Sequence, residues 1–71
     1  MKLSEKLTQL RRQSGMTQDE LAAKLFVTRT AVSKWENDKG YPGIDSLKLL
    51  SQVYGVSIDD LISEEDDASA Q

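Results

Sequence analysis

The chain has 71 residues, a formal net charge of −3, and neither cysteine nor histidine. A single small domain is expected at this length. The lack of cysteine excludes a disulfide scaffold and thiol chemistry. The lack of histidine removes the commonest general base and the commonest metal ligand at neutral pH. The acidic total also argues, at first sight, against nucleic acid as a partner.

Residues 2–14 are predicted to form the first helix. Leucines recur there at steps of four and three, the spacing of one helical face: Leu3, Leu7 and Leu10. Gly15 then suits the left-handed residue that ends a helix. The second helix is predicted over 18–25, because Thr17 and Glu20 fit a capping box in which each side chain accepts a backbone N–H of the other.

The third helix is predicted over 29–36, with Thr28 as its N-cap. Apolar residues follow the cap on one face: Ala31, Val32 and Trp35. Only Phe26 and Val27 separate the second helix from this cap. Two short helices joined by so tight a turn cannot lie antiparallel, so they must cross steeply, which is helix-turn-helix geometry. Trp35 stands at a buried position, and we expect it in the core rather than against nucleic-acid bases.

The remaining chain predicts a loop and two more helices. Residues 37–43 contain two glycines and a proline, which favour turns. Apolar spacing predicts a helix over 44–54, ended by Gly55, and Ser57 caps a last helix over 58–62. No segment alternates between apolar and polar residues as a strand does. The predicted fold is therefore all-α, with five short helices.

Charge is placed unevenly along the chain. Residues 1–63 carry nine basic and eight acidic side chains, a net charge of +1, whereas residues 64–67 are four acids. We predict a helix-turn-helix domain over 1–63 and an acidic, disordered tail over 64–71 that solubilises the chain. A linker to a second domain, or a partner-binding tail, is the alternative. Because the domain is near neutral, the placement of its cations matters more than the total.

The outward face of the third helix is the candidate functional surface. Once its apolar residues are buried, polar and partly cationic side chains remain: Arg29, Thr30, Ser33 and Lys34. Such a face fits the major groove of DNA, where residues near the helix N-terminus reach base edges first. The fork of Arg29 matches guanine O6 and N7, a contact that contributes about 1–3 kcal/mol of discrimination. Lys34 binds guanine or phosphate less specifically, and a merely solvated helix face is the alternative.

These residues, with their flanks, resemble the phage repressor and Cro-like (XRE, Cro/C1-type) helix-turn-helix family. The resemblance covers about residues 3–63 and is carried by these segments and positions: Met16 to Leu25, Val27 to Asn37, Pro42, Leu47, Leu50, Gly55 to Ser57 and Leu61. It implies a compact five-helix, lambda-repressor-like DNA-binding domain, with the helix-turn-helix formed by helices 2 and 3.

The resemblance also implies roles for single residues. Base-reading positions are matched by Arg29, Thr30, Ser33 and Lys34, and phosphate-binding positions by Gln18, Thr28, Asn37 and Lys39. Gln18 stands at a helix N-terminus, which attracts anions, although a cap alone is the alternative. Arg11 and Glu36 match an ion pair behind the recognition helix, which would orient that helix rather than contact DNA.

Phe26 departs from the family, which usually has glycine in this turn. Glycine suits a positive φ, where a bulky residue costs about 1–2 kcal/mol. Either the turn adopts a different backbone with negative φ, or Phe26 is strained and recovers the cost by packing. Tyr41, beside a proline, also has two interpretations: it packs on the core or it touches the DNA backbone.

The expected function is a sequence-specific, double-stranded DNA-binding transcriptional regulator, a repressor, with no catalytic residue, cofactor, metal or small-molecule substrate. A homodimer on a near-palindromic operator is expected, with the last helix and the 40–44 loop as candidate dimer surfaces. No secretory signal or membrane span is visible, which predicts a cytoplasmic protein. The alternative is a helix-turn-helix protein-interaction module or an antitoxin-like partner. An enzyme is the weakest hypothesis, because Asp59 and Asp60 point apart on a helix.

Overall fold

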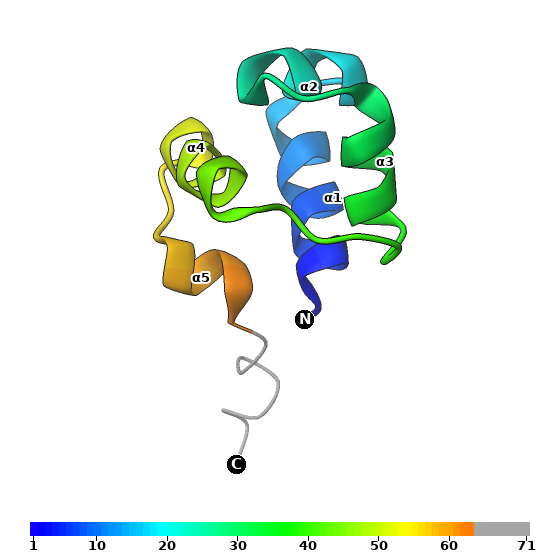
Figure 1. Ribbon diagram of the computed structural model, residues 1–71. Coiled ribbons are helices and arrows are strands. Elements are labelled where there is room, and N and C mark those ends of the chain that lie inside the picture. The colour runs from blue at the N-terminus through cyan, green and yellow to red at the C-terminus, as the bar shows by residue number, and fades with distance from the viewer. Residues whose placement is uncertain (64–71) are drawn as a thin grey trace.

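The computed structural model describes residues 1–63, which form five helices and no strand (Figure 1). In chain order these are α1 (Leu3–Ser14), α2 (Gln18–Leu25), α3 (Arg29–Glu36), α4 (Ile44–Tyr54) and α5 (Ile58–Ile62). The predicted all-α, five-helix architecture is confirmed. The first helix begins one residue later than predicted, and the predicted tail over 64–71 lies outside the described residues.

Local capping explains where the helices begin and end. The Glu20 amide donates to the Thr17 hydroxyl at 3.1 Å, and the Thr17 amide donates to the Glu20 carboxylate at 2.8 Å, which is the predicted capping box. Gly15 and Gly55 end α1 and α4 with φ of 76° and 66°, values that glycine adopts without strain. The Asp60 amide donates to the Ser57 hydroxyl at 2.9 Å and so begins α5.

Every helix contributes one fully buried apolar side chain to a common core. These residues, each no more than 1 % exposed, are Leu7, Leu21, Val32, Leu50 and Leu61. Burying a side chain of this size stabilises a domain by about 1.5–3 kcal/mol. The apolar stripes of five short helices therefore meet in one place, and Trp35 joins this core as predicted from its position.

The helices form two groups around α1. Helix α3 packs against α1 and α2, while α4 packs against α2 and α5, and α5 returns to α1. Figure 1 shows α2 lying across the end of α1, with the segment between α3 and α4 crossing back to the other side of the molecule. One face of α3 is thus held against α1 and α2. None of the helices in residues 1–63 is long and apolar enough to cross a membrane.

The turn between α2 and α3 resolves the two alternatives for Phe26. Its φ is 58° and its ψ is 40°, so the backbone is left-handed, as it would be for glycine. The first alternative, a different backbone with negative φ, is wrong, and the strained conformation of the second alternative is confirmed. The expected recovery by packing is wrong as well, because Phe26 is 84 % exposed. Phe26 therefore carries left-handed strain that its ring does not offset by burial.

Candidate nucleic-acid interface

The pair α2 and α3 is joined by a turn with little freedom. The Val27 amide donates to the Ala22 carbonyl oxygen at 3.0 Å, closing the end of α2. One residue later, the Thr28 hydroxyl accepts from the Ala31 amide at 3.1 Å and begins α3. Ala22, in α2, is buried in the core. The short connection between α2 and α3 is thereby held by a backbone hydrogen bond at the end of α2 and by the Thr28 cap at the start of α3.

Helix α3 has two unlike faces. Val32 and Trp35 are buried against the other helices. The residues predicted to read bases stand at positions that share the opposite face and line one shallow hollow of about 150 Å³: Arg29, Thr30, Ser33 and Lys34. Three of them are exposed, and Ser33 is half-buried. The structure therefore brings the four predicted residues together in one polar, cationic surface.

Arg29 has a neighbour that sequence reasoning missed. Its Nε lies 3.5 Å from Oδ1 of Asp19, in the first turn of α2. Both side chains are mostly exposed, Arg29 at 64 % and Asp19 at 78 %. Asp19 lies in the first turn of α2, where the helix dipole favours acids, and the ten-residue separation gives no local pattern that relates it to Arg29.

Gln18 belongs to a network behind α3. Its side-chain Nε2 donates to Oε1 of Glu36 at 3.0 Å. Arg11 holds the same carboxylate, with Nε donating to Oε2 at 2.7 Å and Nη2 donating to Oε1 at 3.0 Å. An amide NH₂ carries two hydrogens, so Gln18 retains a second N–H for an anion such as phosphate. The residue predicted to bind phosphate is thus also oriented by the end of α3.

Glu36 is nearly enclosed, with a side chain only 5 % exposed. Burial by itself raises the pKa of this carboxyl, but hydrogen bonds from Arg11 and Gln18 and the charge of Arg11 outweigh it and lower the pKa below its ordinary value of 4.5. The bond to Glu36 in turn raises the pKa of the Arg11 guanidinium, against the opposing effect of burial. Both groups are therefore charged at neutral pH.

The other predicted phosphate-binding residues differ in whether their hydrogen-bond donors are already used within the chain. The Thr28 hydroxyl caps α3 but can still donate its own hydrogen. Asn37 uses its side-chain NH₂ within the chain, donating to the Ser33 carbonyl oxygen at 2.8 Å and more weakly to the Ser33 hydroxyl at 3.3 Å. Among residues 1–63, neither Lys34 nor Lys39 forms an ion pair, and both are exposed.

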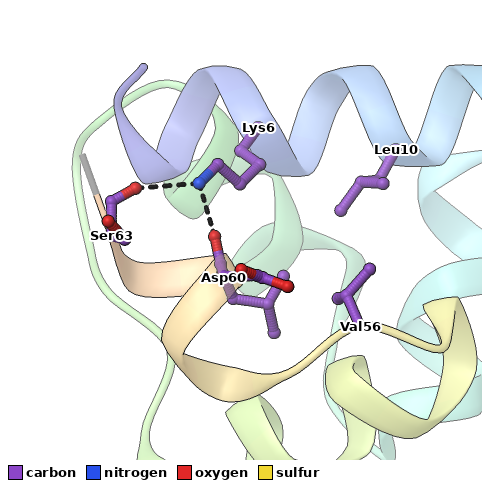
Figure 2. A pocket seen from close by; sticks show the side chains of 6 residues that line it. Lys6, Leu10, Val56, Asp60 and Ser63 are labelled. Carbon is purple, nitrogen blue, oxygen red and sulfur yellow. Dashed lines mark hydrogen bonds between the residues drawn. The ribbon is translucent and has the colours of Figure 1, made fainter. Parts of the chain in front are cut away.

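A separate hollow of about 360 Å³ lies between α1 and α5 (Figure 2). Lys6 reaches across it, and its Nζ donates to the carbonyl oxygens of Asp60 and of Ser63, the latter at 2.8 Å. Asp60 lies within α5 and Ser63 directly follows that helix, and the last carbonyl oxygens of a helix lack partners inside it. Sequence reasoning did not single out Lys6, because its partners are more than 50 residues away. Its role in the structure is to hold α5 against α1.

Several large apolar side chains are exposed outside the α3 face. Tyr41 is 62 % exposed and Ile44 58 % exposed, in the loop before α4 and at its start. Ile62, at the end of α5, is 39 % exposed. Tyr41 therefore does not pack in the core. The interpretation that it touches the DNA backbone stays a prediction, and a contact with another protein is the alternative. These residues fall in the two segments expected to include a dimer surface.

Comparison with known proteins places this geometry in a family. A family model described as helix-turn-helix matches residues 7–61. The HTH-type transcriptional activator BcrR of Enterococcus faecalis is 52 % identical over 66 residues, which is 93 % of this chain and 32 % of that protein. This chain therefore spans about a third of that relative's length.

Solved structures agree with the family match. The P22 c2 repressor protein in complex with a synthetic operator has a TM-score of 0.84 at 25 % identity, covering 89 % of this chain and 96 % of that one. SinR, described as the master regulator for biofilm formation, in complex with DNA has a TM-score of 0.75 at 30 % identity, covering 83 % and 95 %. Since the family model matches more than half of the residues, the chain belongs to the helix-turn-helix family.

Proposed function

We propose that this chain is a sequence-specific, double-stranded DNA-binding transcriptional regulator that reads the major groove with α3. The observation that carries the proposal is the division of α3 into a buried apolar face and an exposed face lined by Arg29, Thr30, Ser33 and Lys34. A helix presented in this way enters the groove with its N-terminal residues against base edges. Two similar structures are DNA complexes, which supports the same use here.

Phosphate contacts complete the proposed interface. Gln18 offers its second amide N–H beside the N-terminus of α2, and Thr28 offers its hydroxyl hydrogen. Lys39 contributes an exposed ammonium from the loop after α3, and that ammonium has no ion pair within residues 1–63. Because the Asn37 amide is already engaged with Ser33, we assign Asn37 a weaker contact than Lys39. Such contacts fix the position of α3 on the duplex without reading sequence.

Regulation by occupancy is the simplest consequence of this surface. A domain seated over an operator that overlaps a promoter excludes polymerase, so we propose repression, the role named for the P22 c2 protein. BcrR is described as an activator, so activation of transcription is the competing outcome. A promoter–reporter assay with the operator placed over, or upstream of, the polymerase site distinguishes repression from activation.

We further propose a homodimer that binds two half-sites about one helical turn apart. The exposed Tyr41 and Ile44, together with Ile62, supply apolar surface for such a contact. An Ile44→Ser variant should lose cooperative binding to paired half-sites while retaining affinity for one half-site. Sedimentation of the protein with each duplex measures both quantities, and unchanged cooperativity would remove this surface from the dimer.

Selection of binding sites from random duplex DNA tests the main proposal most broadly, because one experiment reports binding, sequence and half-site spacing. An enriched near-palindrome supports it, and recovery of unenriched DNA contradicts it. A protein-interaction module is the second candidate, favoured by the exposed apolar residues and by the similar SinR structure solved with SinI protein. Salt separates the two, since DNA binding with several phosphate contacts weakens steeply, with log K falling linearly with log salt.

A further inference from the structure

The ion pair between Asp19 and Arg29 stands at the N-terminal ends of the two helices of the motif. Asp19 is the second residue of α2, and Arg29 is the first residue of α3. Both side chains are mostly exposed, and Arg29 Nε lies 3.5 Å from Asp19 Oδ1. An ion pair in this setting contributes little to folding stability. Its consequence is expected instead at the surface that the two side chains share.

The dipole of α3 does not stabilise the positive charge of Arg29, because Arg29 is the first residue of that helix. The N-terminus of a helix carries a partial positive charge, which disfavours an arginine and favours an acid. Asp19 is favoured at its own position in α2 by the same dipole, and it places a negative charge next to Arg29. Among residues 1–63, Asp19 is the acidic partner of Arg29.

The contact with Asp19 involves a different atom of Arg29 from those that would contact a base. The Asp19 carboxylate lies nearest to Nε, and no hydrogen bond within residues 1–63 engages the two terminal nitrogens of the guanidinium, which form a pair of donors. That pair matches guanine O6 and N7. A carboxylate here also repels phosphate, which an unrestrained arginine would bind at any DNA sequence. The arrangement therefore favours a base contact and disfavours a backbone contact by the same side chain.

We propose that Asp19 is a positioning residue that sets sequence specificity, by holding Arg29 through Nε and by opposing its capture of phosphate. This rests on the proposed function, in which Arg29 reads a base. Asp19 itself needs no contact with DNA for this role. Its removal should raise affinity for random DNA while giving no gain on the operator.

The test compares Asp19→Asn with a matched control, Asp59→Asn. Asp59 is likewise the second residue of its helix, exposed and in the first turn, so the control removes the same charge from an equivalent position in α5. Affinity is measured for the selected operator and for random duplex DNA over a series of salt concentrations. Asp19→Asn should lower the operator-to-random ratio about three- to tenfold, and Asp59→Asn should leave it at the parent value.

Two further readouts separate positioning from a general change in charge. Release of Arg29 in Asp19→Asn should add about one phosphate contact to random DNA. The slope of log K against log salt concentration should therefore become more negative by about 0.9. In an Arg29→Ala background, Asp19→Asn should no longer change the operator-to-random ratio. A steeper slope for the Asp59→Asn control, or an undiminished Asp19 effect without Arg29, would overturn the proposal.

Failure of this inference is distinguishable from failure of the proposed function. If the parent protein prefers its selected operator and Asp19→Asn keeps the full preference, the role of Asp19 is wrong and DNA reading stands. If the parent protein shows no preference for any selected sequence, the proposed function is wrong, and the role of Asp19 is overturned with it.

Discussion

Arg11 and Glu36 join α1 to the last residue of α3 by a two-point ion pair, with N–O distances of 2.7 and 3.0 Å. Arg11 also donates from Nη1 to the Met16 carbonyl oxygen at 3.0 Å, just before α2 begins. Since Gln18 donates to the same Glu36 carboxylate, this pair connects three helices behind the proposed reading surface. The orientation of α3 is thus fixed by charge-assisted hydrogen bonds as well as by the core.

Removing Arg11 should destabilise the domain strongly. An Arg11→Ala variant leaves the Glu36 carboxylate, 5 % exposed, without its cation, and breaking an enclosed pair in this way costs roughly 3 kcal/mol. Arg12→Ala is the matched control, because Arg12 is the adjacent residue and is exposed; it should change stability by less than about 0.5 kcal/mol. Urea unfolding followed by Trp35 fluorescence measures both. Equal effects at the two positions would contradict the account.

The pair also predicts a pH dependence of stability. Because the folded pKa of Glu36 is lowered below 4.5, the unfolded chain takes up this proton first on acidification. The contribution of Glu36 is therefore complete above its unfolded pKa and is lost as the pH falls through the lowered folded value. In Glu36→Gln, the free energy of unfolding should start lower at neutral pH and fall less steeply below about pH 4.5. Parallel curves for the two proteins between neutral and acidic pH would refute this.

Phe26 offers a stabilising substitution. Its left-handed backbone costs about 1–2 kcal/mol, and its ring is 84 % exposed, so little packing is lost on replacement. Phe26→Gly should stabilise the domain by about 0.5–1 kcal/mol after the larger entropy loss of glycine on folding is counted. Phe26→Ala is the control, since it removes the ring but keeps the Cβ and the strain. Thermal unfolding should rank glycine above both alanine and phenylalanine, and an equal gain with alanine would point to the ring instead.

Tyr54 provides a test of polar burial. Its hydroxyl oxygen is buried and has no hydrogen-bond partner within residues 1–63. Tyr54→Phe removes that unpaired group and should leave stability unchanged or raise it by up to about 1 kcal/mol. Tyr41→Phe, at an exposed position, should have no effect. A clear loss of stability in Tyr54→Phe on urea unfolding would mean that the hydroxyl is bonded in solution.

Helix boundaries were predictable because their signals are short-range. Thr17 and Glu20 are three residues apart, and the glycines after α1 and α4 act on the adjacent turn. The strain at Phe26 was recognisable because a residue type departed from the family. Its exposure was not, since the ring's surroundings depend on how the other helices pack.

The contacts within the candidate site were less accessible from the sequence. The resemblance related Arg11 to Glu36, which are 25 residues apart and which the structure joins. Nothing in the pattern related Gln18 to Glu36 or Asp19 to Arg29, because each link requires the crossing angle of two helices and a particular side-chain conformation. Net charge was the least informative property, because the cations of α3 lie on one surface whatever the total.

The central claim is that α3 reads DNA sequence, and Arg29→Ala tests it most directly. The measurement is the affinity of parent and variant for the selected operator and for random duplex DNA at one fixed salt concentration. The account predicts that the variant loses about 1–3 kcal/mol on the operator, with relaxed preference at one base pair and a smaller loss on random DNA. Lys48→Ala, on the exposed side of α4, should keep the parent's preference. An Arg29→Ala variant that binds both DNAs as the parent does would contradict the claim.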